Sequence, residues 1–228
     1  KIVQLVTISF FSYKKNKFWA FKQMYLAEFL LKKIPGLNFY KLLGTGAGAG
    51  FSLYPDFSTY SVLCVWDDLD SANNFINNSY HSSEISNKAF SRNDYFLKPL
   101  HSHGKWDGIN PFNTKNDSNF DKTKPIAIIT RATLNFGKLI EFWRSVPKAS
   151  NAIKSAKGVL WFKGIGELPF IQKATFSIWE NLESVTNFAY KNVNHAEIVK
   201  KTRKRRWYKE DLFSRFEILN KKTKVFNN

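Results

Sequence analysis

The chain is poor in cysteine and has no long apolar run. Among its 228 residues, Cys64 is the single cysteine, which excludes an internal disulfide and a cysteine metal site and is typical of a reducing compartment. Cys64 lies in an apolar segment, so we expect it in the core rather than in catalysis. No apolar run reaches the roughly 18 residues that would span a bilayer. We therefore expect a cytoplasmic protein, with contact to a membrane surface left open.

Several common catalytic and nucleotide-binding motifs are also missing. The sequence contains no HExxH motif, no CxxC pair, no Ser-His-Asp order and no phosphate-binding lysine loop. Residues 44–50, GTGAGAG, imitate a dinucleotide fingerprint, but that site requires a helix directly after the glycines. Residues 51–55, FSLYP, cannot open a helix promptly. We therefore interpret the glycines as a turn and exclude nucleotide binding.

Basic and aromatic residues, by contrast, are abundant. The chain has 35 Lys and Arg against 18 Asp and Glu, a net charge of +17, which favours an anionic partner. The densest basic segment is Lys200–Lys209, which we interpret as a solvated helix end or as a docking site for an anionic ligand or acidic protein, in preference to nucleic acid. The 7 Trp, 9 Tyr and 22 Phe residues fit either a Phe-rich core or a deep apolar pocket.

The chain contains an internal repeat. Residues 61–85 and 176–198 align on Trp66 and Trp179, and both tryptophans are followed by acidic residues, a leucine, a serine and an Asn-Phe pair. Each copy ends in a histidine, His81 in the first and His195 in the second, followed by an acid and an isoleucine. This self-similarity indicates a duplicated module.

Hydrophobic periodicity predicts the same order of elements, β-α-β-β-α-β, in both halves. The expected strands are residues 2–13, 38–43, 59–66, 95–100, 126–134, 160–165, 171–179 and 213–219, and the expected helices are residues 18–34, 70–89, 138–156 and 184–207. We predict an α+β protein of tandem ferredoxin-like halves that make a barrel-like pair. The predicted boundaries are an N-terminal half at 1–104, a linker at 105–124 and a C-terminal half at 125–228.

His195 is the candidate metal ligand. Asn194 is a good N-cap, which would place His195 in the first turn of a helix, where the helix dipole keeps the imidazole neutral as a metal ligand must be. Thr202 and Arg206 follow at offsets of 7 and 11, close to the same face of that helix. Such a face suits a haem whose iron is ligated and whose propionate is paired. The alternative is an ordinary structural histidine.

Five segments of the chain resemble the spheroidene monooxygenase family of carotenoid biosynthesis. These segments are FYKLLGTGAGAGF, HGKWDGINPF, PIAIITRATL, FKGIGELPFIQKATFSIW and HAEIVKKTRKRRWYKEDLFSRFEIL. The similarity is colinear from FWAFKQM at 18–24 to about Leu219 and covers nearly the whole chain.

The resemblance implies a monooxygenase that introduces an oxo group into an acyclic carotenoid, with haem b as cofactor, O2 as co-substrate and a ferredoxin-type electron donor. It also implies a fold of the dimeric α+β barrel type, and superfamily precedent leads us to expect a homo-oligomer. Haem-binding members of that superfamily carry the proximal histidine on a helix of the C-terminal half, a position that matches His195.

The resemblance also selects arginines, because several stand in family-like motifs. Arg131 and Arg144 are the predicted catalytic residues, and Arg203, Arg206 and Thr202 are predicted to bind the haem with His195. Two alternatives remain open. One is another enzyme of the same superfamily, either a cofactor-free oxygenase or a haem enzyme such as a dehydratase; the other is a non-catalytic module that binds haem or lipid.

Overall fold

The computed structural model describes residues 4–48, 52, 54–114, 120–168, 170–191, 200–202 and 204–226. The chain divides into two compact units. Unit 1 comprises residues 1–45, 56–99 and 218–228, and unit 2 comprises residues 46–55 and 100–217. Both units combine helices with a sheet, which confirms the predicted α+β class.

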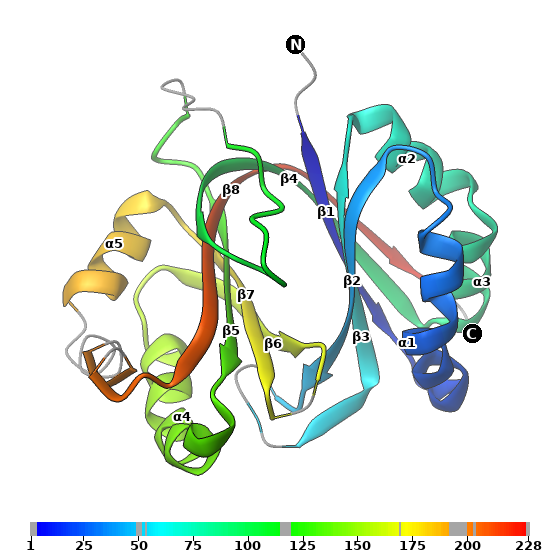
Figure 1. Cartoon of the computed structure of the whole chain (residues 1–228). Helices are drawn as coiled ribbons and strands as arrows, with labels where there is room; N and C mark the ends of the chain where they lie inside the picture. Colours follow the sequence, from blue (N-terminus) through cyan, green and yellow to red (C-terminus); the bar gives the residue numbers. More distant parts are fainter. Residues whose placement is uncertain are drawn as a thin grey trace. The chain divides into compact units, whose positions relative to one another are not determined.

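Unit 1 contains four strands and three helices among its described residues. They are β1 (Leu5–Ser12), α1 (Lys17–Leu31), β2 (Leu37–Gly46), β3 (Pro55–Trp66), α2 (Leu69–Asn78), α3 (Tyr80–Lys88) and β4 (Ser91–Gly104). The strand order is β4-β1-β3-β2, and β1 pairs antiparallel with both β3 and β4. The three helices cover one face of this sheet (Figure 1).

Unit 2 repeats this order of elements. They are β5 (Ile126–Leu134), the short 3-10 helix η1 (Phe136–Lys138), α4 (Leu139–Lys154), β6 (Val159–Gly166), β7 (Gln172–Trp179), α5 (Leu182–Lys191) and β8 (Tyr208–Val225), whose residues from Ile218 on belong to unit 1. The strand order is β8-β5-β7-β6, and β5 pairs antiparallel with β7 and β8. The two units thus share one strand order, as expected for a duplicated module.

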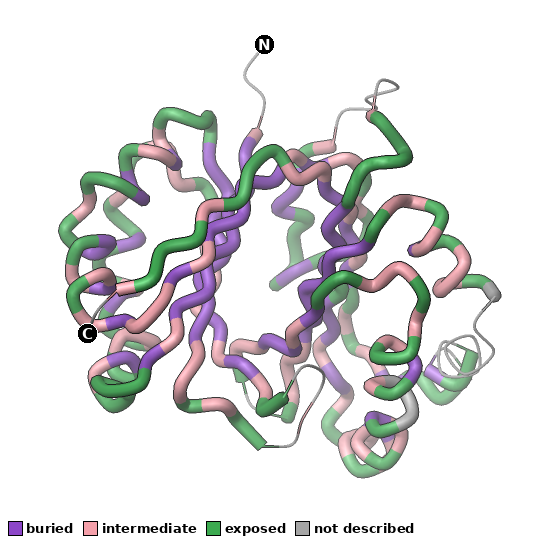
Figure 2. The backbone as a smooth tube through the Cα atoms, turned by 180° about the vertical axis from the view of Figure 1, so that it is seen from behind, coloured by how far each residue is buried: buried purple, intermediate pink, exposed green. Residues whose placement is uncertain are grey.

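Buried residues are concentrated in the strands, whereas the helices expose much of their surface (Figure 2). The repeated tryptophans, Trp66 and Trp179, are both buried. Each indole N–H donates to a hydroxyl inside its own unit, Trp66 to Thr7 at 2.8 Å and Trp179 to Ser177 at 3.0 Å. Cys64 is 2% exposed, which confirms its place in the core. Burial raises the pKa of its thiol, so the thiolate is strongly disfavoured.

Several predicted boundaries were wrong. The helix expected at 70–89 is two helices, because Ser79 takes an extended conformation and its hydroxyl caps α3 by accepting from the Ser82 N–H at 3.0 Å. The strands expected at 95–100 and 213–219 are longer, because pairing along β1 and β5 continues beyond the apolar core of each segment. The predicted helix at 184–207 is described only as α5 and as helical turns at 200–202 and 204–205; its remainder lies outside the described residues.

The described element that follows the glycine segment is a strand and not a helix. β2 ends at Gly46, and β3 begins at Pro55. A pyrophosphate site of that kind would require a helix N-terminus instead. Within the part of the chain that the structure describes, no helix is long and apolar enough to cross a membrane.

Candidate functional site

Unit 2 has a cavity of about 690 Å³, open on one side, between the strands β5, β7 and β8 and the helices α4 and α5. Its volume is in the range of small-molecule sites. Most of its wall is apolar. The larger apolar and aromatic side chains are Ile128, Phe142, Val146, Ile153, Trp179, Val185, Phe188, Trp207, Leu212 and Phe213. Such a wall favours a largely apolar ligand.

Small side chains on the sheet create the space. β5 and β7 pair with Thr130 opposite Thr175 and Ile128 opposite Ser177. Because side chains alternate along a strand, these residues share one face of the sheet with Ala132. Thr130, Thr175, Ser177 and Ala132 have short side chains, which leaves space between this face and the helices that cover it.

The helices supply the opposite wall with residues at helical spacing. Phe142, Val146 and Ile153 line the cavity from α4 at offsets of 4 and 11, and Val185 and Phe188 line it from α5 at an offset of 3. α5 begins where the Asn181 side chain accepts a hydrogen bond from the Ser184 N–H at 2.9 Å. This cap determines where the helical face starts and therefore which residues reach the cavity.

Unit 1 fills the equivalent space. Leu5 of β1 pairs with Trp66, and Ile126 of β5 pairs with Trp179, so Leu5 and Ile126 are equivalent positions. Six residues further along each strand, Phe11 of unit 1 is equivalent to Ala132 of unit 2. The corresponding cavity in unit 1 measures only about 10 Å³. The duplicated scaffold is therefore open in one copy and closed in the other.

A buried histidine helps to close unit 1. His81 is 6% exposed and lies among the residues of that small cavity with Phe75 and Arg92. Burial, and secondly the Arg92 charge, lower the pKa of His81 to about 4. The imidazole is therefore neutral at neutral pH and packs as part of the core.

Cationic side chains lie at the cavity of unit 2. Lys173, Arg206 and Lys209 contribute to its wall. Burial lowers the pKa of Lys173, whose ammonium lies 4.9 Å from the centre of the Trp143 ring. A partly buried ammonium is stabilised by an anion placed beside it. The wall also includes the acids Glu210 and Asp211, so an anionic group on a bound ligand would complement Lys173 itself and not the whole wall.

Two residues of the wall carry a polar group that is itself buried. The Thr175 hydroxyl and the Trp207 indole N–H are buried and have no hydrogen-bond partner among the residues that the structure describes. Buried polar groups normally have partners, because leaving one unpaired costs about 1–3 kcal/mol.

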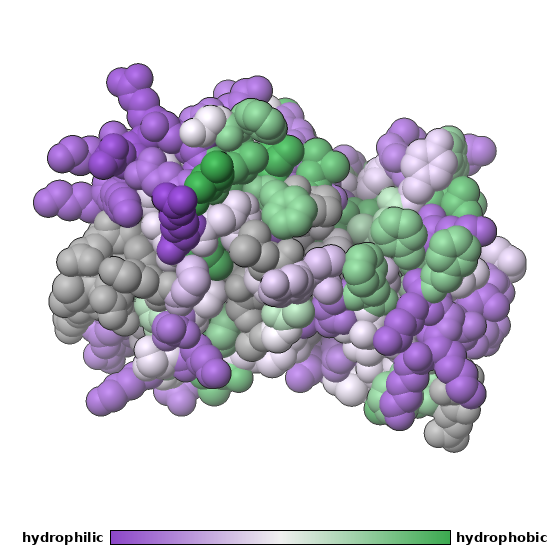
Figure 3. Space-filling model, turned by 90° about the horizontal axis from the view of Figure 1, so that it is seen from below, coloured by the Kyte–Doolittle hydropathy of each residue, from purple (hydrophilic) through white to green (hydrophobic). Residues whose placement is uncertain are grey.

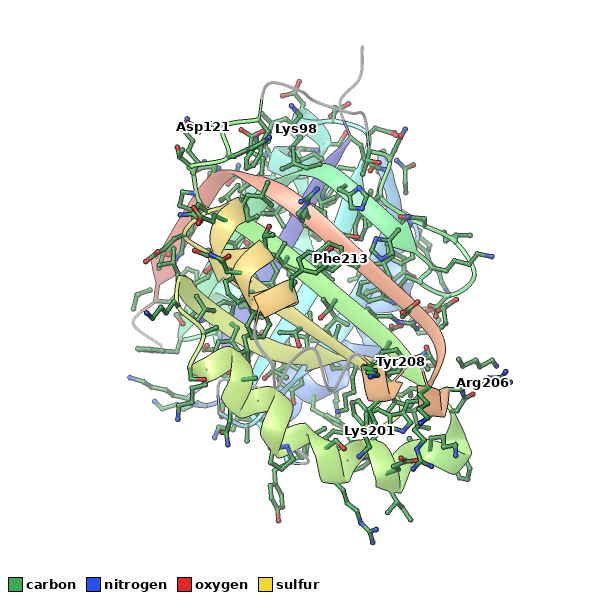
Figure 4. The ribbon with its side chains drawn as sticks, turned by 90° about the vertical axis from the view of Figure 1, so that its left-hand side faces the viewer. Lys98, Asp121, Lys201, Arg206, Tyr208 and Phe213 are labelled. Carbon is green, nitrogen blue, oxygen red and sulfur yellow. The ribbon has the colours of Figure 1, made fainter. Side chains whose placement is uncertain are left out.

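Three of the predicted site residues meet at this cavity. Thr202 is buried and Arg206 is exposed, and both contribute to the wall together with Arg131. Figure 4 shows Arg206, Tyr208 and Lys201 together near the start of β8, close to α4. Thr202 shares a side-chain hydrogen bond with Tyr208, and burial raises the pKa of that phenol.

The other predicted residues are not part of the described wall. Arg144 is exposed on α4 and is absent from the described cavity wall. His195 and Arg203 lie outside the described residues. Within the described part of the chain, no group of three or more His, Cys, Asp or Glu could hold a metal ion. A haem iron needs only one such ligand, so this finding does not bear on haem.

Arg131 lies in a cluster of carboxylates. Its guanidinium donates to Glu210 and, at 3.1 Å, to Asp107, and a Glu167 oxygen lies 4.0 Å away. It also lies 5.6 Å from the centre of the Trp106 ring, whose N–H donates to Glu167 at 2.7 Å. These contacts connect β5 and β8 to the turn at 106–109.

Glu210 completes this clamp. Its carboxylate accepts backbone hydrogen bonds from Asp107 at 2.9 Å and Gly108 at 2.7 Å. Burial opposes ionisation of Glu210, but these two bonds and the Arg131 charge outweigh it, so the pKa of Glu210 is lowered. Arg131 therefore positions a turn as well as contributing to the cavity wall.

Sequence reasoning missed Lys173, Thr175 and Trp207. The signal for the first two was present, because Lys173, Thr175 and Ser177 alternate with apolar residues along β7. By itself, this alternation predicts only a strand. One face of β7 is polar and the other is apolar. When both faces of a strand are covered by the rest of the unit, a polar face indicates a cavity or a ligand.

Comparison with known proteins identifies relatives over most of the chain, although no family model matches. The spheroidene monooxygenase of Cereibacter sphaeroides is 34% identical over 220 residues, which cover 95% of this chain and 67% of the relative. The spheroidene monooxygenase of Rhodobacter capsulatus is 30% identical over 201 residues, which cover 88% of this chain and 83% of the relative.

Solved structures support the fold. A crystal structure of an aldoxime dehydratase matches 95% of this chain and 82% of its own with a TM-score of 0.64 at 10% identity. A second aldoxime dehydratase, in complex with butyraldoxime, matches 100% of this chain and 84% of its own with a TM-score of 0.62, also at 10% identity. At this identity the likeness shows a shared fold alone.

The sequence relatives define the class of this protein as an enzyme, a monooxygenase. The chain belongs to the spheroidene monooxygenase family. This confirms the family resemblance that the sequence segments indicated.

Proposed function

We propose that the protein is a haem-dependent monooxygenase that introduces an oxo group into an acyclic carotenoid or a similar apolar substrate. The haem would occupy the cavity of unit 2. The observation that carries this proposal is the cavity itself, which is apolar and has cationic side chains in its wall. The fold that we propose with it is a pair of tandem ferredoxin-like halves of the dimeric α+β barrel type, supported by the strand order that the two units share.

The residues present fit a haem in two respects. The apolar wall suits a porphyrin, and Lys173 and Arg206 suit its carboxylates. The predicted iron ligand, His195, lies outside the described residues. In the sequence, His195 stands between α5 and Thr202, and residues of α5 and Thr202 line the cavity.

Bound haem would supply the O2 chemistry that the side chains of this chain lack. The protein's own contribution is binding, orientation and exclusion of water. His195, Thr202, Arg203 and Arg206 are the proposed haem-binding residues. For Arg131 the clamp on residues 106–109 supports a positioning role. Arg144 stays a prediction, because its side chain is exposed and is not among the described residues of the wall.

Substrate and partners follow from the family and from the charge. The relatives are named for spheroidene, which supports a carotenoid as substrate. A monooxygenase also needs O2 and an external reductant, and we propose a ferredoxin-type electron donor. The exposed part of the basic segment, including Lys201, Lys204 and Arg205, suits docking of an acidic donor protein.

The test is a haem titration followed by absorption spectroscopy. Wild-type protein should take up one haem per chain and develop a Soret band, and His195→Ala should lose the band or shift it. The matched control is His103→Ala, which removes an exposed histidine and should leave the spectrum unchanged. An unchanged spectrum for His195→Ala would reject the ligand assignment.

Product analysis in a carotenoid-producing host then tests the substrate. An oxo-carotenoid that depends on the protein supports the proposal. Haem uptake without such a product would indicate a haem enzyme that acts on another substrate. Activity in the absence of haem and metal would indicate a cofactor-free oxygenase.

A further inference from the structure

Helix α1 exposes an aromatic stripe on the side opposite its packing face. The packing face consists of the buried residues Ala20, Ala27 and Leu31. The aromatic stripe consists of Phe18, Phe21, Tyr25 and Phe29, which are 70%, 53%, 64% and 54% exposed. The spacings of 3, 4 and 4 residues place all four side chains along one side of the helix. A surface helix normally carries polar residues on this side.

Further apolar side chains extend the stripe. Leu26 and Leu30 are exposed beside it on α1. Phe57 of β3 is 56% exposed and contacts Phe21, with ring centres 6.3 Å apart. Figure 3 shows hydrophobic side chains between hydrophilic ones at the right of the view, the side where Figure 1 draws α1. Single exposed apolar residues are common, but a contiguous patch indicates an interaction surface.

Lysines surround this patch. Residues 14–33 contain six lysines, one glutamate and no arginine, a net charge of +5. The glutamate, Glu28, forms an ion pair with Lys32 at 2.7 Å. The lysines are Lys14, Lys15, Lys17, Lys22, Lys32 and Lys33. The patch therefore combines an aromatic centre with a strongly basic rim.

We propose that α1 docks the protein on an anionic lipid bilayer. The aromatic stripe and the two leucines would enter the interfacial layer, and the lysines would extend to the phosphate groups of the lipids. Helices that lie in a membrane interface have this composition, with aromatic residues and leucine on one side and lysine at the border. Charge complementarity selects anionic headgroups over neutral ones.

Two other occupants fit the surface less well. A second copy of the chain would bring two rims of +5 together in a symmetric interface, where like charges repel. An acidic protein would suit the charge, but protein interfaces are enriched in arginine and depleted in lysine. The rim of α1 has only lysine. This inference does not rest on haem or on the carotenoid, because it concerns lipid binding by unit 1 alone.

The experiment is vesicle flotation of the full chain without added haem or substrate. The probe is vesicles of equal parts phosphatidylcholine and phosphatidylglycerol, compared with phosphatidylcholine alone. Wild-type protein should float with the anionic vesicles, and raising the salt concentration should weaken this binding. The double variant Phe18→Ser with Phe29→Ser should bind the anionic vesicles at least about tenfold more weakly than wild type. The reason is that the variant has lost two phenyl rings whose transfer from water into the lipid favours binding.

A matched control removes exposed apolar side chains elsewhere. Phe136 and Ile140 are 82% and 72% exposed in unit 2, and Phe136→Ser with Ile140→Ser should float like wild type. Circular dichroism and a denaturant titration show that each variant is folded.

Three outcomes would overturn the proposal. The first is wild-type protein that stays in solution with anionic vesicles, and the second is a stripe variant that floats like wild type. The third is a different occupant: lipid-free wild-type protein that dimerises through the stripe, or binds a purified acidic ferredoxin through it, without floating. Failure of haem uptake would leave this result untouched.

Discussion

The guanidinium of Arg131 is almost fully removed from water and lies between carboxylates that are more exposed. Its side chain is 1% exposed, whereas those of Asp107, Glu167 and Glu210 are 44%, 18% and 21% exposed. A single cation thus stabilises several acids around the turn at 106–109. Removing the cation leaves these acids unpaired in a partly buried place.

We predict that Arg131→Met lowers the free energy of unfolding by about 2 kcal/mol, less than for a fully buried pair because water still reaches the acids. Urea titration measures this loss. Arg144→Met is the matched control, because Arg144 is exposed on α4, and its stability should change by less than about 0.5 kcal/mol. A stable Arg144→Met enzyme with reduced turnover would support the predicted catalytic role of Arg144, whereas unchanged turnover would contradict it.

His81 gives the protein a pH-dependent stability. Its pKa in the folded protein is about 4, against an ordinary value of 6.5 for histidine, so the unfolded chain binds the proton more readily between these values. Stability contributed by the neutral imidazole is therefore complete above pH 6.5 and falls as the pH decreases towards 4. The loss should amount to roughly 2–4 kcal/mol.

Unfolding free energies across this pH range test the assignment. His81→Gln should remove most of this slope, because it cannot take up the proton. His103→Gln, at an exposed position on β4, should retain the wild-type slope. Equal slopes in wild type and His81→Gln would show that other groups cause the acid sensitivity.

At the scale of elements, α2 and α5 follow the repeated tryptophans and begin in the same way. Asp68 accepts from the Ser71 N–H at 2.8 Å, and Asn181 accepts from the Ser184 N–H at 2.9 Å. These are the equivalent positions of the repeat, two residues after Trp66 and Trp179. The N-cap was preserved in function although the residue changed from an acid to an amide.

We predict that Asn181→Ala destabilises the protein by about 1 kcal/mol, because the first turn of α5 loses its cap. Apolar-ligand binding in unit 2 should weaken as well, because this cap sets the position of Val185 and Phe188. Asn151→Ala on an exposed position of α4 is the control and should be neutral or slightly stabilising. Thermal unfolding of both variants at equal pH measures this difference in stability. Equal unfolding temperatures for Asn181→Ala and Asn151→Ala would contradict the role of Asn181 as a cap.

Most elements could be predicted from local pattern. Alternation predicted the strands, the 3.6-residue period predicted the helices, and the repeat predicted that both units share one order. The break at Ser79 was missed because serine at this place can continue a helix or cap the next one. The extended backbone of Ser79 shows that this serine ends one helix and caps the next. Likewise, the apolar residues of α1 predicted a helix correctly, but their spacing does not tell which side meets the sheet.

At the scale of the whole molecule, the two units differ in what fills the space between sheet and helices. Phe11 occupies in unit 1 the place that Ala132 has in unit 2. The cavities measure about 10 Å³ and 690 Å³. One scaffold therefore supports a packed core in the first copy and a binding site in the second.

We predict that exchanging these residues separates binding from stability. Ala132→Phe should abolish uptake of haem, or of an apolar fluorescent probe, with little loss of stability, because the new ring enters empty space. Phe11→Ala should leave uptake intact but cost about 3–4 kcal/mol, because it opens a cavity in a packed core. Undiminished uptake by Ala132→Phe would place the ligand elsewhere.

The sequence by itself determined the order of the elements, the internal repeat and the family, because these depend on residues near one another in the chain or on similarity along it. Only the tertiary structure decided which copy is open, which arginine is held by carboxylates and which side of α1 faces water. Each of these depends on contacts between residues far apart in sequence, such as Arg131 with Glu210 or Phe21 with Phe57. Burial and packing arise from such contacts, and no local pattern contains them.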